Sequence, residues 1–119
     1  MAGFEIRRGD IVIVDLNPVR GSEQRGQNRP CLVIQNDTGN QYSPTTIVAP
    51  FTTGYDSDDI YPFEVEVPAD TSPLNEDSVV DLSQIRVLDT DRRIQKTIGK
   101  LDYGTMAQVD RAIRESLGL

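Results

Sequence analysis

The stretch Gly9–Gln35, GDIVIVDLNPVRGSEQRGQNRPCLVIQ, contains two apolar runs separated by a long polar loop. The runs Ile11–Leu16 and Cys31–Gln35 are short and bounded by turn residues, which predicts two strands. The first run is apolar at every position but Asp15, which indicates burial on both of its faces. The loop between them is much longer than the roughly 2–5 residues of an ordinary hairpin connection, and loops of this kind often carry function.

The centre of this loop, Gly21–Pro30, is polar and punctuated by glycines. Three arginines lie in it or next to it, Arg20, Arg25 and Arg29, together with Glu23. A guanidinium group is planar, permanently charged and donates hydrogen bonds in a fork, a geometry that suits phosphate oxygens. The loop is therefore a candidate site for a phosphate-bearing ligand.

Outside this stretch the pattern remains mostly β. Alternation in Phe63–Val67 predicts a strand with one buried and one exposed face, and Pro50 is expected to end the strand before it. The other expected elements are strands at Thr45–Ala49, Ser78–Leu82 and Thr97–Leu101, and turns at Asn36–Asn40 and Asp89–Asp91, the second with room for one helical turn.

The C-terminal segment has a different period. Apolar residues recur there at intervals of 3, 4 and 4 residues, which is typical of an amphipathic helix that faces a core or a second subunit. A capping box at Thr105–Gln108 or an N-cap at Asp102 begins this helix, and Gly118 suits its end. The apolar stripe consists of Met106, Val109, Ile113 and Leu117. The expected architecture is a small, bent antiparallel sheet or barrel with a terminal helix.

The length of 119 residues and the hydrophobic content of 37% predict one globular domain, residues 1–119. No apolar run reaches the roughly 18–20 residues of a membrane span, and no signal-peptide core is evident, so a cytoplasmic protein is expected. Cys31 is the single cysteine and its apolar neighbours favour a buried structural thiol. The chain has no histidine, which excludes zinc sites of the His/Cys type and removes the commonest general base; no metal or cofactor is expected.

The net charge of −7 is unevenly distributed. Residues 1–54 are neutral overall, residues 82–119 carry +2, and residues 55–81 contain nine acidic groups and no basic one. The arginine-bearing loop thus lies outside the acidic segment. An Asp-rich, Lys-poor composition fits either a salt-loving source or an ordinary acidic, solvated face.

Several short motifs occur in a fixed order along the chain: RGDI (8–11), DLNP (15–18), GSEQ (21–24), RP (29–30), QND (35–37), SPT (43–45), QIR (84–86) and SLGL (116–119). Each is weak by itself. In this order they resemble the MazF/PemK family of toxin endoribonucleases, and the resemblance covers nearly the whole chain.

The resemblance implies a mainly β fold with a C-terminal helix, a small SH3-like bent antiparallel barrel of the CcdB/PemK type, which forms a homodimer. It also implies the toxin of a type II toxin–antitoxin system, neutralised by a cognate antitoxin protein whose disordered tail lies over the RNA groove. Such a toxin cleaves single-stranded RNA at short sequence motifs without a metal, leaving a 2′,3′-cyclic phosphate and a 5′-hydroxyl.

The family's catalytic arginine matches Arg29, its catalytic threonine matches Thr52, and the glutamate of its loop matches Glu23. Two features depart from the family pattern: Val87 replaces a frequent threonine, and the region 53–61 carries three aspartates where relatives are often less acidic. The expected RNA-binding residues are Ser22, Gln24, Arg25, Asn36, Gln84 and Arg86.

These side chains suit cleavage by the RNA's own 2′-hydroxyl. Arg29 can stabilise charge on the phosphorane-like transition state, and Thr52 can donate to a non-bridging oxygen or orient the 2′-hydroxyl. Arginine stays protonated, so Glu23 is the best local candidate for a general base. Gln84 can position groups but cannot transfer protons.

Each residue also has a purely structural interpretation. Arg29 could form an ion pair that anchors the loop, and Thr52 could make an ordinary backbone hydrogen bond. Glu23 could be a solvated charge, Gln84 a turn cap, and Asn36 part of turn chemistry.

Two other functions use the same fold class. A gyrase-poisoning toxin acts by protein binding, depends on the end of its C-terminal helix, and does not need Arg29 and Thr52 together. A catalytically inactive SH3-like module could instead use the acidic segment 55–81 to bind a basic partner.

Overall fold

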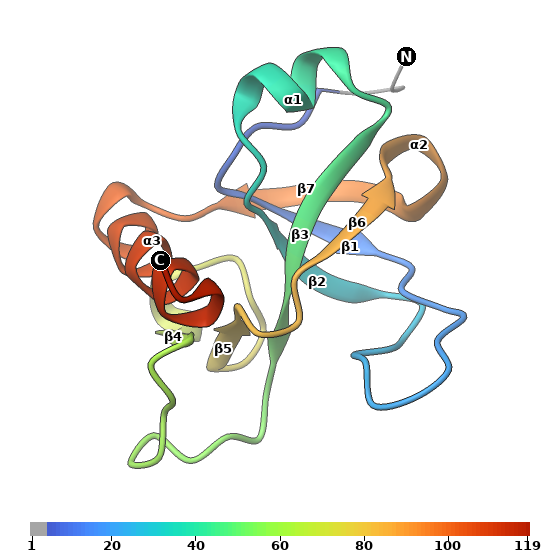
Figure 1. Cartoon of the computed structure of the whole chain (residues 1–119). Helices are drawn as coiled ribbons and strands as arrows, with labels where there is room; N and C mark the ends of the chain where they lie inside the picture. The colour runs from blue at the N-terminus through green and yellow to red at the C-terminus, as the bar shows by residue number, and fades with distance from the viewer. Residues whose placement is uncertain (1–4) are drawn as a thin grey trace.

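The computed structural model describes residues 5–119, which form a bent antiparallel sheet with a long helix at the C-terminus (Figure 1). The sheet order is β4-β5-β3-β2-β1-β7, and β6 pairs with β3 off this path. The strands are β1 (Asp10–Val14), β2 (Arg29–Val33), β3 (Thr45–Thr52), β4 (Glu64–Val67), β5 (Ser78–Asp81), β6 (Arg86–Asp89) and β7 (Ile94–Lys100). The helices are α1 (Asp37–Tyr42), α2 (Thr90–Arg93) and α3 (Tyr103–Leu117), with a short 3-10 turn at Ala69–Thr71.

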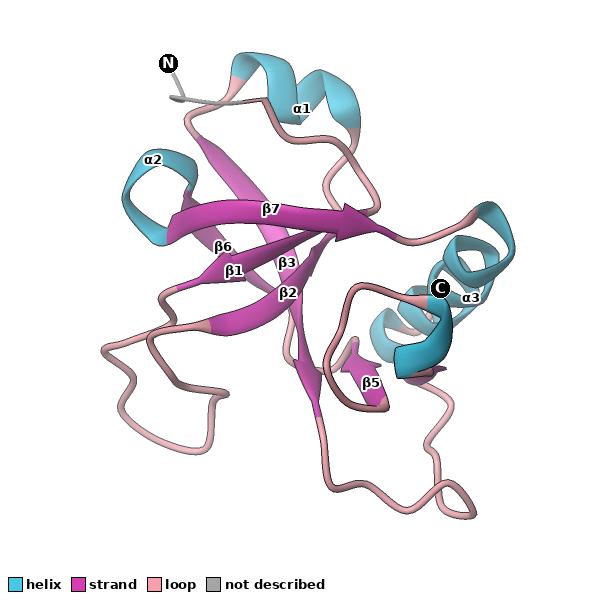
Figure 2. Cartoon of the chain, turned by 180° about the vertical axis from the view of Figure 1, so that it is seen from behind, coloured by secondary structure: helices cyan, strands magenta, loops and turns pink. Residues whose placement is uncertain are grey.

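The predicted fold class is confirmed: the molecule is mainly β with a C-terminal helix. The pairings of the described strands end at β4 on one side and β7 on the other, so the sheet is bent but not closed into a full barrel. The bend arises in β3, whose first half pairs with β6, whose middle pairs with β2 and whose last two residues pair with β5. The view from behind shows β1, β2 and β7 on one side of this bend and β5 with α3 on the other (Figure 2).

Both faces of the central strands are covered by apolar side chains. One cluster packs between the sheet and α3 and includes Ile11, Phe51 and Val109. The second lies on the opposite face and includes Val12 and Val14. Neighbouring residues of β1 thus contribute to different clusters, which confirms the predicted burial of this strand on both faces.

The prediction that Pro50 ends its strand is wrong. β3 continues through Pro50 to Thr52, and Pro50 lies opposite Cys31 of β2. Proline lacks an amide donor and is therefore usually excluded from central strands. Here Pro50 lies at the end of the pairing between β3 and β2, next to the start of the pairing between β3 and β5. The missing amide donor therefore does not interrupt the middle of either ladder.

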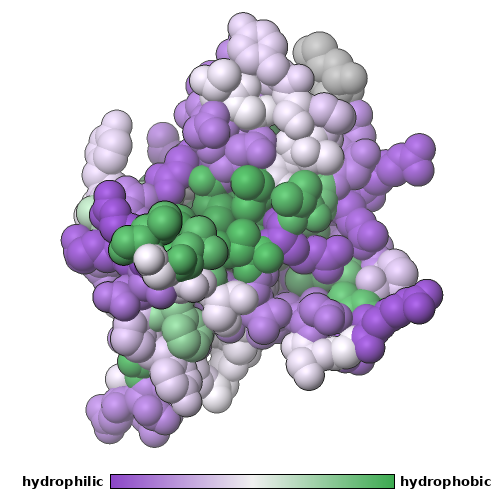
Figure 3. Space-filling model, viewed as in Figure 1, coloured by the Kyte–Doolittle hydropathy of each residue, from purple (hydrophilic) through white to green (hydrophobic). Residues whose placement is uncertain are grey.

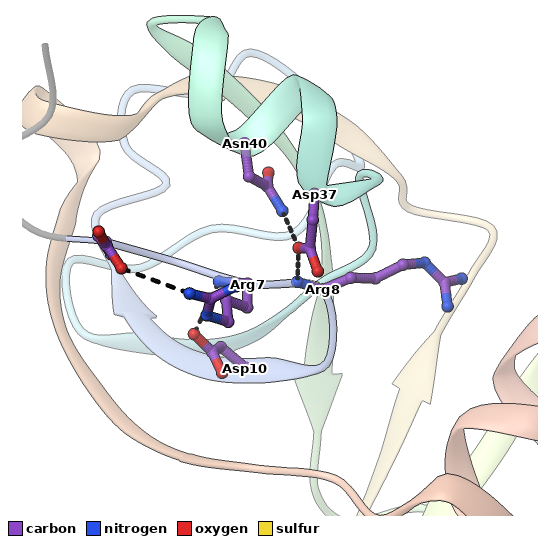
Figure 4. Close-up of polar contacts among 6 residues, drawn as sticks. Arg7, Arg8, Asp10, Asp37 and Asn40 are labelled. Carbon is purple, nitrogen blue, oxygen red and sulfur yellow. Dashed lines mark hydrogen bonds and ion pairs between the residues drawn. The ribbon is translucent and has the colours of Figure 1, made fainter.

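The segment Asn36–Asn40, predicted as a turn, instead begins helix α1. The Asn36 side chain caps the helix by accepting a hydrogen bond from the Gly39 amide at 2.8 Å. Contacts with a distant part of the chain hold it: Asp37 Oδ1 accepts from the Arg8 backbone amide at 2.6 Å and from Asn40 Nδ2 at 3.2 Å (Figure 4). Tertiary contacts therefore outweigh the low helix propensity of glycine and asparagine here.

Helix α3 follows the sequence prediction closely. Asp102 is the N-cap, accepting from the Thr105 amide at 2.7 Å, and Gly118 ends the helix with a φ of 72°. Val109 is fully buried, whereas Leu117 at the end of the stripe is 60% exposed. The stripe thus contributes partly to the core and partly to the surface.

Cys31 is fully buried in the cluster opposite α3. Burial raises the pKa of its thiol to about 12, although the positive charges of Arg29 and Arg86 act in the opposite direction. The thiol therefore stays protonated at neutral pH, as expected of a structural cysteine. Among residues 5–119, no helix is both long and apolar enough to cross a membrane.

The Asp37 contacts predict a pH-dependent contribution to stability. Hydrogen bonds, chiefly that from the Arg8 backbone amide, hold the pKa of Asp37 below its usual value of 3.8. Its charge therefore stabilises the fold above the pKa of the unfolded chain, and this contribution is lost as pH falls through the lower folded pKa. We expect Asp37→Asn to lower the urea midpoint at pH 7, with the difference from wild type shrinking towards pH 3. Asp58→Asn, an exposed carboxylate on another loop, is the control, and a difference that is constant with pH would contradict the assignment.

Candidate active site

The antiparallel pairing of β2 and β3 brings the predicted catalytic residues to one end of the sheet. Arg29 is the first residue of β2, and Thr52 is the last residue of β3. The loop from β1 to β2 folds back over this end, so that Gln24 lies between them. Gln24 Nε2 donates to Thr52 Oγ1 at 3.0 Å, and Arg29 Nη2 donates to Gln24 Oε1 at 3.2 Å. One amide side chain therefore links the arginine to the threonine.

Neutral oxygens hold the guanidinium of Arg29. Its Nη2 also donates to the Phe51 carbonyl at 2.7 Å, while its Nε is buried and has no hydrogen-bond partner. No carboxylate of residues 5–119 lies within 4 Å of this guanidinium. An ion pair, the structural alternative for Arg29 in the sequence analysis, therefore does not hold this side chain. Its positive charge remains available for an anion, which would interact with it strongly in this half-buried position.

Gly26 makes room for the Arg29 side chain. Its φ is 130°, and a Cβ placed there would lie 2.7 Å from Arg29 Cγ. The loop backbone at this point is fixed by two contacts: the Leu16 amide donates to the Gly26 carbonyl at 2.8 Å, and the Gly26 amide donates to Asn17 Oδ1 at 3.2 Å. Only a residue without a side chain allows the loop to lie this close to the arginine.

Gln84 and Arg86 reach the same region from the other side of the loop. Gln84 Oε1 accepts from the Gln24 backbone amide at 3.3 Å, which helps to place the linking residue. Arg86 Nη1 donates to the Leu16 carbonyl at 3.1 Å. Both line a cavity of about 260 Å³, together with Glu23 and Gln24.

Glu23 lies beside this network but outside its hydrogen bonds. Its side chain is exposed, and Oε2 accepts from the Arg20 amide at 3.3 Å. It lines the cavity next to Gln24, so it could reach a ligand held there. Ser22 and Arg25 are exposed on the same loop, where the Arg25 guanidinium donates to the Gly21 carbonyl.

Asn36 does not join this site. It follows the far end of β2 and caps α1, so the length of a strand separates it from Arg29. The site also contains features that the sequence prediction missed. Gly26 could have been suspected because glycine often marks a close approach of the backbone, whereas no sequence signal identifies the Phe51 carbonyl, since every residue has one.

Together these groups form an anion site with a hydroxyl next to it. A guanidinium without a carboxylate partner can bind a phosphate oxygen, Thr52 offers a hydroxyl, and Glu23 offers a carboxylate in the adjoining cavity beside Gln24. Such a set can stabilise charge that develops on a phosphate while a nearby carboxylate accepts a proton.

Comparison with known proteins identifies the family. Residues 7–117 match the family model described as "PemK-like, MazF-like toxin of type II toxin-antitoxin system". The protein named endoribonuclease MazF of Staphylococcus epidermidis is 49% identical over 114 residues, which cover 96% of this chain and 92% of that protein.

Solved structures share the fold. MazF from Deinococcus radiodurans has a TM-score of 0.77 at 27% identity, covering 98% of this chain and 99% of the other. A mycobacterial endoribonuclease in complex with its cognate antitoxin has a TM-score of 0.77 at 23% identity, covering 96% of each chain. Because the family match spans nearly all of the sequence and a relative is almost half identical, the chain belongs to the PemK-like, MazF-like toxins of type II toxin–antitoxin systems.

Proposed function

We propose that this protein is a sequence-specific, metal-independent endoribonuclease toxin that cuts single-stranded RNA through the RNA's own 2′-hydroxyl. The observation that carries the proposal is the Arg29–Gln24–Thr52 arrangement, in which a guanidinium without a carboxylate partner is hydrogen-bonded through one amide to a hydroxyl. Its messenger RNA substrate would place its action in the cytoplasm.

In this reaction the 2′-oxygen attacks the adjacent phosphorus and the bond from phosphorus to the 5′-oxygen breaks. The products are a 2′,3′-cyclic phosphate and a 5′-hydroxyl. The nucleophile must lose a proton, the leaving oxygen must gain one, and negative charge builds up on the non-bridging oxygens between these events. The protein therefore needs a proton acceptor and a fixed positive charge, whereas the nucleophile comes from the substrate.

Arg29 supplies the fixed positive charge. Because the Phe51 carbonyl and Gln24 already orient the guanidinium, little reorganisation is needed as the phosphorane-like transition state forms. Thr52 donates to a non-bridging oxygen or orients the 2′-hydroxyl. Gln24 fixes the positions of Arg29 and Thr52 relative to each other, and Gln84 accepts a hydrogen bond from the Gln24 backbone amide.

Glu23 is the proposed general base. It is the carboxylate that lines the cavity beside Gln24, and Arg29 cannot take the role because arginine stays protonated. Ser22, Arg25 and Arg86 are proposed to hold the RNA backbone near the cavity. Asn36, at the other end of β2, would meet only RNA that runs the length of the sheet or that lies on a second copy of the chain.

The proposed partners are a second copy of this chain and a cognate antitoxin. An apolar face is defined here as Ile47, Ile85, Val87, Ile113 and Leu117, which lie on β3, on β6 and the residue before it, and on α3. Val87 is 59% exposed and Leu117 is 60% exposed. Figure 3 shows hydrophobic residues gathered across the middle of this side of the molecule. An exposed apolar patch of this kind marks an interaction surface, and we assign it to the homodimer.

The first test is cleavage of a long single-stranded RNA by the purified protein in EDTA. We expect discrete cuts with 5′-hydroxyl ends. Arg29→Ala is expected to slow cutting by about 100-fold or more, because removing one oriented donor to a developing oxyanion typically costs ~10²–10³ in rate. Thr52→Ala should also slow it, whereas Arg111→Ala, an exposed arginine on α3, should not. Loss of cutting in EDTA would refute metal independence, and full activity of Arg29→Ala would refute the assigned role.

The second test concerns the general base. We expect Glu23→Gln to reduce the cleavage rate by about 100-fold or more, since general-base catalysis contributes ~10²–10⁴. The acidic limb of the pH–rate profile should disappear in this variant, because the titrating group is gone. Glu115→Gln on α3 serves as the matched control. A pH–rate profile of Glu23→Gln with the same shape as that of the wild type would show that another group is the general base.

The third test concerns the apolar face. Val87→Asp puts a charge in its centre, which opposes burial against a second apolar surface. We expect light scattering after size exclusion to give the mass of a dimer for the wild type and of a monomer for Val87→Asp. Thr97→Asp, on the exposed part of β7, should remain dimeric. If Val87→Asp still forms a dimer of wild-type stability, the homodimer interface lies on another surface.

A further inference from the structure

A second cavity of about 290 Å³ adjoins the proposed active site. Arg29, Phe51 and Thr53 line it, whereas Pro50 and Gln24 line the cavity of about 260 Å³. Because successive residues of a strand face opposite sides of a sheet, the two cavities lie on opposite faces of the β2–β3 end. The Arg29–Gln24–Thr52 arrangement therefore lies between two spaces: Arg29 lines the second cavity, whereas Glu23 and Gln24 line the first.

The walls of the second cavity combine apolar surface with a polar edge. Ile13, Pro30 and Ile98 contribute apolar surface from the three strands that lie together in Figure 2. The connection from β4 to β5 contributes Leu74, followed directly by Asn75 and Glu76. A cavity with apolar walls and a few placed hydrogen-bonding groups suits a small, partly apolar ligand, and a splayed base of single-stranded RNA is such a ligand.

The β4–β5 connection is held in place before any ligand binds. Leu74 is only 8% exposed and belongs to the core cluster under α3. Pro73 lies against β7, where a Cβ on Gly99 would be only 2.7 Å from Pro73 Cγ, so glycine is required at that position. The Ser78 hydroxyl donates to the Glu76 carbonyl at 2.9 Å. Asn75 and Glu76 are therefore presented from a supported loop.

The charge of Glu76 determines what this cavity can accept. Glu76 belongs to the acidic segment 55–81, and a carboxylate repels a phosphate group. A carboxylate is, however, a good acceptor for the amino group of a base. RNA can interact favourably with both Arg29 and Glu76 if a phosphate lies at Arg29 and the neighbouring base enters the cavity.

We propose that the cavity lined by Leu74, Asn75 and Glu76 is a nucleobase pocket that helps to set the cleavage motif. In this pocket Glu76 accepts a hydrogen bond from the amino group of adenine, cytosine or guanine, and Asn75 contacts the same edge. Uracil has no amino group, and its N3–H donor lies between two carbonyl oxygens that a carboxylate repels, so uracil is disfavoured there. The proposal rests on the proposed ribonuclease function and assigns one part of its substrate specificity.

The test compares cleavage motifs. Wild type, Glu76→Gln and Asp58→Asn are incubated with an RNA pool of random sequence, and the new 5′-hydroxyl ends are sequenced. Asp58→Asn removes the same charge from the same acidic segment at a residue that does not line the cavity. We expect the wild type and Asp58→Asn to disfavour uracil at one position next to the cut. A glutamine side chain adds a donor for the O4 of uracil, so Glu76→Gln should reduce that discrimination by about tenfold.

A second readout does not depend on cleavage. A random pool of oligonucleotides with 2′-deoxy sugars, which cannot be cut by this route, is captured on the wild-type protein and sequenced. Depletion of uracil at one position, lost in Glu76→Gln, is expected. Thermal melting of each variant checks that the fold is intact.

The outcomes separate this proposal from the ribonuclease function. If the wild type cuts RNA in an Arg29-dependent way but Glu76→Gln keeps the wild-type motif in both experiments, the pocket assignment is wrong and the function stands. If the wild type does not cut but its captured pool lacks uracil in a Glu76-dependent way, the function is wrong and the pocket stands. Capture without any base preference overturns the pocket and favours a protein segment as its occupant.

Discussion

Strand β3 hydrogen-bonds to β6 over its first half, to β2 in its middle and to β5 over its last two residues. A strand with three partners must twist away from one sheet and into another, and its antiparallel pairing with β2 places the end of β3 beside the start of β2. Arg29 and Thr52, 23 residues apart in the sequence, meet there for this reason. Cavities lie beside this end of the sheet, so the candidate site depends on how one strand divides its hydrogen bonds among its partners.

The proposed chemistry depends on a positive charge that no carboxylate neutralises. In a chain with a net charge of −7, that condition requires the acidic groups to be kept away from Arg29. Neutral acceptors achieve it, because the Phe51 carbonyl and Gln24 orient the guanidinium without cancelling its charge. Most acidic side chains of segment 55–81 are engaged elsewhere or exposed: Glu66, for example, accepts from Tyr55 at 2.7 Å and from Ser57 at 2.5 Å. Glu76 is the member of that segment that reaches a cavity shared with Arg29.

Much of the fold was predictable because it depends on local patterns. Continuous apolar residues in β1 indicated burial on both faces, and Ile11 and Val12 do belong to different clusters. The stripe of α3, its cap at Asp102 and its glycine stop follow from helical geometry, which involves only residues close in sequence. Helix α1 was missed because Asp37 is held by Arg8, a contact 29 residues away that no local pattern reveals. The prediction that Pro50 ends its strand was wrong for a similar reason, because the effect of a proline on a strand depends on which strand lies beside it.

The order of the amino acids specifies which side chains are available: three arginines on a long loop, one cysteine, no histidine, and an acidic segment without basic residues. Its ordered motifs also pointed to the right family, and Arg29 was singled out before any geometry was known. The folded chain is needed to show that Gln24 links Arg29 to Thr52, that a backbone carbonyl and not a carboxylate holds the guanidinium, and that Asn36 lies apart from them. Side-chain chemistry belongs to single residues, whereas distances between residues far apart in the chain are set by strand pairing and packing, and these depend on the whole fold at once.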